Sequence, residues 1–183
     1  MFVFPFGLLI IISINITKCQ LNDVGFYSPP HGFAILRVMS EELISAYDIR
    51  GSEATGLTVE CAWNVGKAVA DWLPTDGSVL VSGITSEAKL IDAAIEGLRL
   101  QGRAVISARE LSKEQVIERI TTDRLSGAIL IGYDELAEVK TIEIYQHEGH
   151  LVTSETGLMS LRDLVEAGNF VPAATKGELT SLA

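Results

Sequence analysis

The sequence predicts an α/β protein, a three-layer α/β/α domain with a mixed, mostly parallel sheet and an antiparallel edge hairpin. Three observations predict this fold. Apolar residues at helical spacing alternate with short apolar strands between residues 58 and 132, and the connections between these segments are short. The next apolar segment then changes to a period of two, which is typical of a strand with one face in water.

The first predicted elements are a helix, a strand and a second helix. The first helix follows Thr58, a favourable N-cap residue, and ends at Pro74, which cannot continue a helix. Residues 78–83 form a short strand. The second helix starts near Ser86 and stops at Gly102, because glycine readily adopts the left-handed conformation found after helices.

The next elements repeat this order. Residues 104–106 predict a strand, and Ser112 with Gln115 has the form of a capping box that begins a third helix. Residues 127–132 are a continuous apolar run between glycines. Such a run is typical of a strand buried on both faces of a parallel sheet, so we expect helices on both sides of this one.

The pattern changes after this strand. Residues 141–145 alternate between apolar and polar, like an edge strand with one wet face. A polar turn follows at residues 147–150, and the apolar positions of residues 158–165 predict a last helix that ends at Gly168.

The chain divides into an apolar and irregular extension (residues 1–38), the α/β domain (39–171) and a polar, flexible tail (172–183). Residues 2–16 are apolar but too short for a comfortable membrane-spanning helix, and no Lys or Arg precedes them as in a signal peptide. We expect translation to begin at Met39, which makes the protein cytoplasmic. The alternatives are a membrane anchor or an atypical export signal.

Composition excludes several classes of function. The chain has 24 Asp and Glu against 14 Lys and Arg, a net charge of −10, which argues against nucleic-acid binding and suits ordinary solubility. Its two cysteines have no zinc-site spacing. His147 and His150 share the polar turn, for which a solvated hairpin is a better interpretation than a metal site. We therefore expect no metal in this chain.

Tyr-Asp-Ile-Arg-Gly at residues 47–51 is the most informative motif. Together with the helix, strand, helix and strand after it, this motif resembles the first domain of the phosphohexomutases, the phosphoglucomutase and phosphomannomutase family. Residues 56–58 and 94–98 add to the resemblance, which runs from about residue 44 to residue 171. It covers only the first of the four domains in a full enzyme of the family.

The resemblance implies the family's chemistry, but this chain has other residues at the positions that carry that chemistry out. In the family, a phosphoserine after the buried strand exchanges its phosphoryl group with a hexose phosphate, and Mg²⁺ is held by a later domain. Here Tyr133 occupies the phosphoserine position, Asp134 and Glu135 replace a His-Asn pair, and Leu136 replaces a proline. The loop at residues 83–87 lacks the family's basic groups. The resemblance therefore implies no catalytic residue and no cofactor in this chain.

Arg50 and Tyr47 are the candidate phosphate-binding residues, since in the family the Arg and Tyr of this motif face the phosphoryl site. A guanidinium also presents a fork of donors that suits phosphate. The competing interpretation is structural: Arg50 pairs with Asp48 or with a helix C-terminus and only shapes the start of the domain. We favour this structural interpretation, because the basic loop beside Arg50 is missing.

We therefore predict a stand-alone, degenerate first domain of a phosphohexomutase, inactive alone and acting as a binding or regulatory module. Its expected partners are a second copy, a full-length mutase paralogue or a phosphosugar. Nucleic acid is not expected, and a membrane only if residues 1–38 are translated. The alternatives are a subunit of a split hexose-phosphate mutase completed by another chain, and a decaying gene fragment.

Overall fold

The computed structural model describes residues 39–74 and 77–182, which all belong to one compact unit, Leu36–Ala183. The predictions of an anchor, of an export signal or of a start at Met39 concern residues 1–38 and lie outside the described residues. Among the residues that are described, no helix is both long enough and apolar enough to cross a membrane.

The centre of the fold is a six-stranded mixed sheet with the order β1-β5-β4-β2-β3-β6. Three neighbouring pairs are parallel (β2–β3, β2–β4 and β3–β6), whereas β4–β5 and β1–β5 are antiparallel. This arrangement confirms the predicted mixed, mostly parallel sheet. The strands are β1 (Ile49–Gly51), β2 (Val79–Gly83), β3 (Val105–Arg109), β4 (Gly127–Asp134), β5 (Val139–Gln146) and β6 (Leu179–Ser181).

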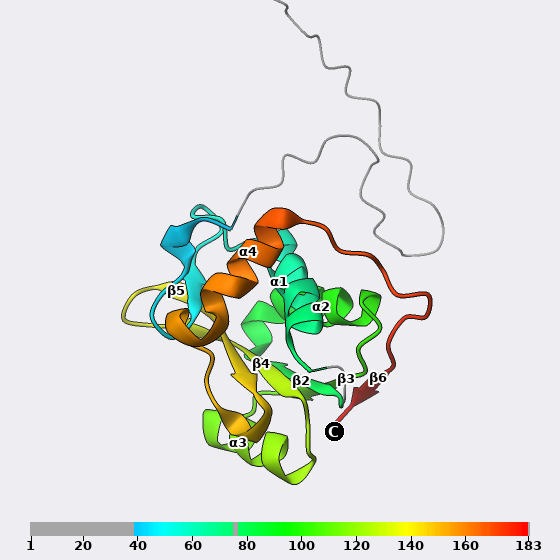
Figure 1. Cartoon of the computed structure of the whole chain (residues 1–183). Helices are drawn as coiled ribbons and strands as arrows, with labels where there is room; N and C mark the ends of the chain where they lie inside the picture. Colours follow the sequence, from blue (N-terminus) through cyan, green and yellow to red (C-terminus); the bar gives the residue numbers. More distant parts are fainter. Residues whose placement is uncertain (1–38, 75–76, 183) are drawn as a thin grey trace, which may run out of the picture. The chain divides into compact units, whose positions relative to one another are not determined.

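Helices cover both faces of the sheet, as predicted. The helices α1, α2 and α4 lie on one side, and α3 lies on the other (Figure 1). The central strands are buried on both faces because each face carries its own apolar cluster, the larger under α1, α2 and α4 and the smaller under α3. The helices are α1 (Val59–Trp72), α2 (Ala88–Leu100), α3 (Lys113–Thr122) and α4 (Met159–Ala167).

The helix starts follow the predicted capping chemistry. The Thr58 side chain accepts a hydrogen bond from the Cys61 N–H at the start of α1. Ser112 and Gln115 form a complete capping box at the start of α3. Each cap satisfies backbone N–H groups that have no partner inside the helix, which fixes where the helix begins.

The end of α1 is held by a buried arginine. Arg103, 7% exposed, donates from its guanidinium to the carbonyl oxygens of Ala70, Leu73 and Pro74. These carbonyl oxygens accept no hydrogen bond within the helix, so the guanidinium satisfies them. Its positive charge also complements the negative end of the helix dipole. The short segment before β3 is thereby tied to the last turn of α1.

The two helices α1 and α2 meet through glycines. A Cβ built on Gly66 would overlap the Ala94 carbonyl oxygen, and one built on Gly97 would overlap the Trp63 carbonyl oxygen. The two backbones are therefore in direct contact, closer than side chains would allow. On the sheet side, α2 packs against β2 and β4.

The antiparallel part of the sheet differs from the prediction in two details. Tyr133 and Asp134 are the last residues of β4 and pair with Lys140 and Val139 of β5, so they are not in a loop. In addition, β5 is not an edge strand, since β1 pairs along its outer side. The polar sequence at the end of β4 suggests a loop, but hydrogen bonds to β5 extend the strand.

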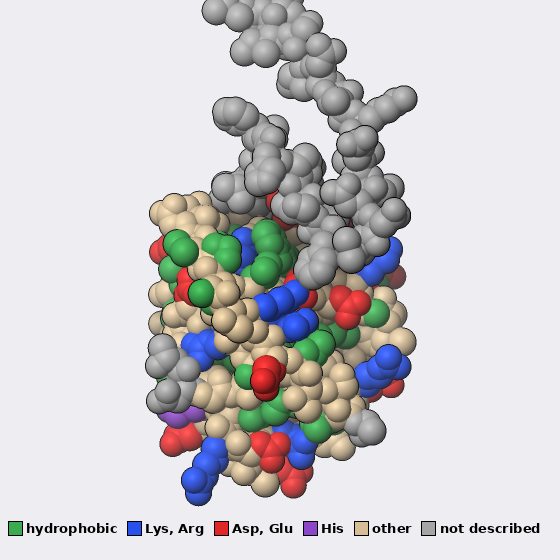
Figure 2. All heavy atoms as spheres, turned by 90° about the vertical axis from the view of Figure 1, so that its right-hand side faces the viewer, with side chains coloured by type: hydrophobic (Ala, Val, Ile, Leu, Met, Phe, Trp, Pro, Cys, Tyr) green, Lys and Arg blue, Asp and Glu red, His purple; other side chains and the backbone are tan. Residues whose placement is uncertain are grey.

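The structure also corrects the expectation of a flexible tail from residue 172. Leu179–Ser181 form β6, which pairs with β3 in parallel. The segment leading to β6 is tied down by backbone hydrogen bonds from Ala173 N–H to Leu100 and from Gly177 N–H to Arg99. Figure 2 shows this side of the described unit, where charges of both signs lie among hydrophobic side chains.

Candidate functional site

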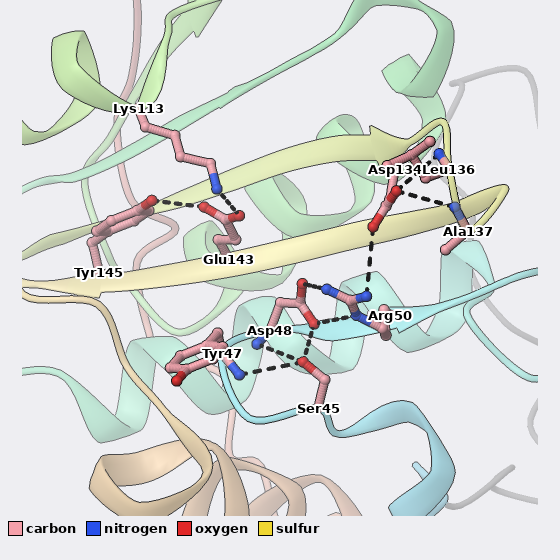
Figure 3. Close-up of polar contacts among 10 residues, drawn as sticks. All are labelled: Ser45, Tyr47, Asp48, Arg50, Lys113, Asp134, Leu136, Ala137, Glu143 and Tyr145. Carbon is pink, nitrogen blue, oxygen red and sulfur yellow. Dashed lines mark hydrogen bonds and ion pairs between the residues drawn. The ribbon is translucent and has the colours of Figure 1, made fainter.

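A hollow lined by charged side chains lies on the α3 side of the sheet, where β1, β5 and the end of β4 meet the first turn of α3. We call it the β1–β5 hollow, and its volume is about 300 Å³. It collects the Arg of the motif at residues 47–51 and several groups from distant parts of the chain (Figure 3). The residues that line it are Asp48, Arg50, Lys113, Leu130, Gly132, Tyr133, Asp134, Thr141 and Glu143.

Strand register brings these groups together. Arg50 lies opposite Thr141, which in turn lies opposite Gly132. Residues directly opposite in neighbouring strands share one face of a sheet, and alternate residues along a strand return to that face. Asp48, Asp134 and Glu143 therefore join the same surface. Gly132 forms its floor and carries no side chain that would fill the hollow.

Asp48 and Arg50 form a two-point ion pair. The Arg50 Nε and Nη2 atoms donate to the two Asp48 carboxylate oxygens at 2.7 and 2.5 Å, and the Ser45 hydroxyl also donates to Asp48. Burial opposes ionisation of Asp48, but the hydrogen bonds from Arg50 and Ser45 outweigh it, so the pKa of Asp48 is lowered. The same pair raises the pKa of Arg50. Two of the Arg50 guanidinium nitrogens are thus already paired with Asp48, just before β1.

Asp134 faces the other edge of the same guanidinium. Its Oδ2 atom lies 3.6 Å from Arg50 Nη1, an ion-pair distance that is too long for a hydrogen bond. Its Oδ1 atom accepts from the backbone N–H groups of Leu136 and Ala137 at 3.0 and 3.1 Å. Asp134 therefore both orders the β4–β5 turn and places a second carboxylate beside Arg50.

Lys113 and Glu143 form a second ion pair in the hollow, and the buried Tyr145 is hydrogen-bonded to Glu143. Lys113 Nζ lies 2.5 Å from Glu143 Oε1, and the Tyr145 hydroxyl donates to Glu143 Oε2 at 2.6 Å. Burial and the hydrogen bond to Glu143 raise the pKa of Tyr145. Sequence reasoning missed Lys113 and Glu143 as site residues. The period-two pattern of β5 indicates that Glu143 is on the wet face, but not that the start of α3 meets it there.

Comparison with known proteins finds distant sequence relatives of this chain. No family model matches it. Phosphohexose mutases of Xanthomonas campestris pv. campestris are 26% identical over 145 residues, which cover 78% of this chain and 32% of the relative. A phosphomannomutase of Salmonella typhimurium is 27% identical over 130 residues, covering 69% of this chain and 28% of the relative. The chain is phosphohexomutase-like.

A solved structure supports the fold of this phosphohexomutase-like chain. A phosphoglucomutase/phosphomannomutase family protein from Burkholderia thailandensis superposes with a TM-score of 0.60 at 17% identity, covering 78% of this chain and 33% of that one. The phosphohexomutase-like chain thus spans about a third of the length of the relatives that it matches.

The two tyrosines singled out from the sequence do not join Arg50. Tyr133 is among the residues that line the hollow, but it follows Gly132 in β4, so strand alternation directs its side chain to the opposite face of the sheet, where Ile131 is buried. The Tyr47 ring points away from Arg50 and is 63% exposed (Figure 3). In this phosphohexomutase-like chain, neither hydroxyl is placed to act with the guanidinium.

Acidic groups occupy the ends of the neighbouring strands in this phosphohexomutase-like chain. Glu110 follows β3, and its carboxylate accepts hydrogen bonds from the N–H and the hydroxyl of Thr85, which follows β2; these bonds lower the pKa of Glu110. Lys140 Nζ lies 2.9 Å from the Glu87 carboxylate. Within the described residues, no group of three or more His, Cys, Asp or Glu side chains is arranged to hold a metal ion.

Proposed function

We propose that this phosphohexomutase-like chain is a binding or regulatory module that does not transfer phosphoryl groups by itself. The observation that carries the proposal is the register of β4, in which Tyr133 follows Gly132, so that strand alternation turns the Tyr133 side chain away from the face that carries Arg50. Phosphoryl transfer requires the carrier oxygen and the groups that stabilise the phosphate to meet in line at near-attack distance. A tyrosine hydroxyl on the other face does not satisfy this requirement.

Electrostatics supports the same proposal. The β1–β5 hollow has two cationic side chains and three carboxylates, so one carboxylate is in excess. Arg50 is already paired with Asp48 and faces Asp134. A transferring phosphoryl group carries negative charge on its oxygens, and carboxylates close to it repel that charge.

The test is phosphoprotein formation. The full chain is incubated with ³²P-labelled glucose 1,6-bisphosphate and Mg²⁺, and mutase turnover is measured with glucose 1-phosphate. We expect neither a labelled protein nor turnover, and a full-length phosphomannomutase serves as the positive control. Label on Tyr133, or turnover that disappears in Tyr133→Phe, would contradict the proposal.

The module's proposed partners are a second copy of the chain, a full-length mutase paralogue or a phosphosugar, and its proposed location is the cytoplasm. Pull-down with the tagged chain from its native cells tests the first two partners. A captured mutase that also co-elutes with the chain in size-exclusion chromatography would support the regulatory role. Failure of both partners to co-elute would leave the module with a small-molecule ligand.

A split hexose-phosphate mutase is the second candidate function, and the names of the sequence relatives, phosphohexose mutases and a phosphomannomutase, favour it. In that case another chain supplies the remaining parts. Mixing the chain with a phosphomannomutase that lacks its first domain tests this candidate. Turnover restored by this chain supports it, and turnover restored only by the relative's own first domain contradicts it.

A further inference from the structure

We propose that the β1–β5 hollow binds an uncharged, polyhydroxylated molecule the size of a monosaccharide and discriminates against its phosphorylated form. The inference rests on the proposed function and revises its small-molecule ligand, which at this hollow is an unphosphorylated sugar rather than a phosphosugar. A volume of about 300 Å³ is at the lower end of ligand pockets and suits one small molecule.

The first support is unused hydrogen-bonding capacity between Arg50 and Asp134. The 3.6 Å between Nη1 and Oδ2 leaves both atoms without a hydrogen bond to each other. A hydroxyl group donates one hydrogen bond and accepts others, so it bridges a guanidinium and a carboxylate without separating them. An ionic group on a ligand would instead have to displace one partner of the pair.

The second support comes from the other side of the hollow. Lys113 uses one of its three ammonium donors on Glu143. Thr141 lies between the two ion pairs, and among the described residues its hydroxyl makes no hydrogen bond. Donors and acceptors therefore alternate across the hollow. Neighbouring hydroxyl groups on a polyol match such an alternation.

The third support is the charge balance. Both cations already carry a carboxylate partner, and the excess carboxylate makes the hollow slightly anionic. A phosphate dianion would add like charge to this group, which costs affinity. The space over Gly132 is largely open, since the Thr141 hydroxyl oxygen, at 3.1 Å, is the single atom that a Cβ built there would meet within 4 Å among the described residues.

The experiment is a ¹⁵N-NMR titration of the full chain with D-mannose, with mannose 6-phosphate and with inorganic phosphate. We expect D-mannose to shift the backbone amides of Gly132 and Thr141 at millimolar concentration. Mannose 6-phosphate should bind about tenfold more weakly, and inorganic phosphate should cause no shift at these amides.

Two variants sharpen the test. Asp134→Asn keeps an oxygen that accepts hydrogen bonds from the N–H groups of the β4–β5 turn, but removes the negative charge beside Arg50. Its affinity for mannose 6-phosphate should therefore rise about tenfold. Asp92→Asn, on the exposed side of α2, is the matched control. Gly132→Val should lower mannose affinity about tenfold, with the NMR spectrum reporting whether the variant folds.

Mannose that leaves the Gly132 and Thr141 amides unshifted up to about 50 mM, where the weakest ligands would still register, would overturn the inference. So would mannose 6-phosphate that binds as tightly as mannose. These outcomes are separate from the phosphoprotein assay. A labelled chain that also binds mannose would refute the proposed function and leave the ligand class standing.

Discussion

Asp48 is 3% exposed, so its charge depends on partners inside the protein, and Arg50 supplies two of them. Arg50→Met should lower the free energy of unfolding by about 1–3 kcal/mol, because a buried carboxylate loses its charged hydrogen-bond donors. The measurement is urea unfolding at pH 7. Adding Asp48→Asn to Arg50→Met should recover part of the loss, whereas independent and additive losses would contradict this account.

The surroundings of Lys67 on α1 predict that the stability of the protein depends on pH. Its ammonium lies 3.7 Å from the centre of the Trp63 ring and 4.5 Å from that of Phe170. Burial lowers the pKa of Lys67 from 10.5 to about 8, against the opposing charges of Glu60 and Asp71. Between these two pH values the unfolded chain binds more protons, so the free energy of unfolding contributed by Lys67 rises with pH.

Lys67→Met removes this titration and keeps the apolar contact. We expect the difference in melting temperature between the variant and the wild type to be largest at pH 7.5, in favour of the variant, and to shrink towards pH 10.5. The exposed Lys89→Met is the control. A difference that stays constant over this range would mean that the two rings, which favour the charged amine, cancel the effect of burial.

The sequence predicts local features of the site and misses those that depend on distant pairing. The Asp48–Arg50 pair lies within one short stretch of chain, so the residue types and the spacing of two are sufficient to predict it. Lys113 and Glu143 are 30 residues apart, and their contact depends on how α3 packs over β5. Likewise, the face on which Tyr133 lies depends on the register of β4 and β5.

At the scale of elements, the crossing of α1 and α2 leaves no room for a side chain between the two helix backbones. Gly97→Val should destabilise the protein by about 3 kcal/mol, since the new side chain would overlap the Trp63 carbonyl and push the helices apart. Urea unfolding monitored by circular dichroism measures the loss. Asp92→Val, on the exposed side of α2, controls for the low helix propensity of valine and should cost less than about 1 kcal/mol.

The helices and central strands were predictable because their signals are local. The caps at Thr58 and Ser112 and the apolar run of β4 each determine one element. By contrast, β6 has three exposed residues and no alternating pattern, so its sequence does not differ from that of a loop. Its strand conformation comes from hydrogen bonds to β3, which no local pattern encodes.

At the scale of the whole molecule, the segment from α4 to β6 passes close to the start of β3. A Cβ built on Gly177 would overlap the Arg103 carbonyl oxygen, so only glycine fits there. Gly177→Ala should lift this segment off the sheet, cost about 1–3 kcal/mol and increase hydrogen exchange at Val105, which donates to the Glu178 carbonyl. Thr175→Ala on the same segment should leave the exchange rate unchanged.

The sheet ends in a three-residue strand on each side, β1 and β6, while the eight-residue strands β4 and β5 lie between neighbours. A short edge offers another chain few unpaired backbone groups to extend. Polymerisation by strand addition is therefore disfavoured as long as both end strands stay paired. Copies of this domain that associate would then do so through side chains, and they would remain soluble where a sheet with a long open edge forms fibres.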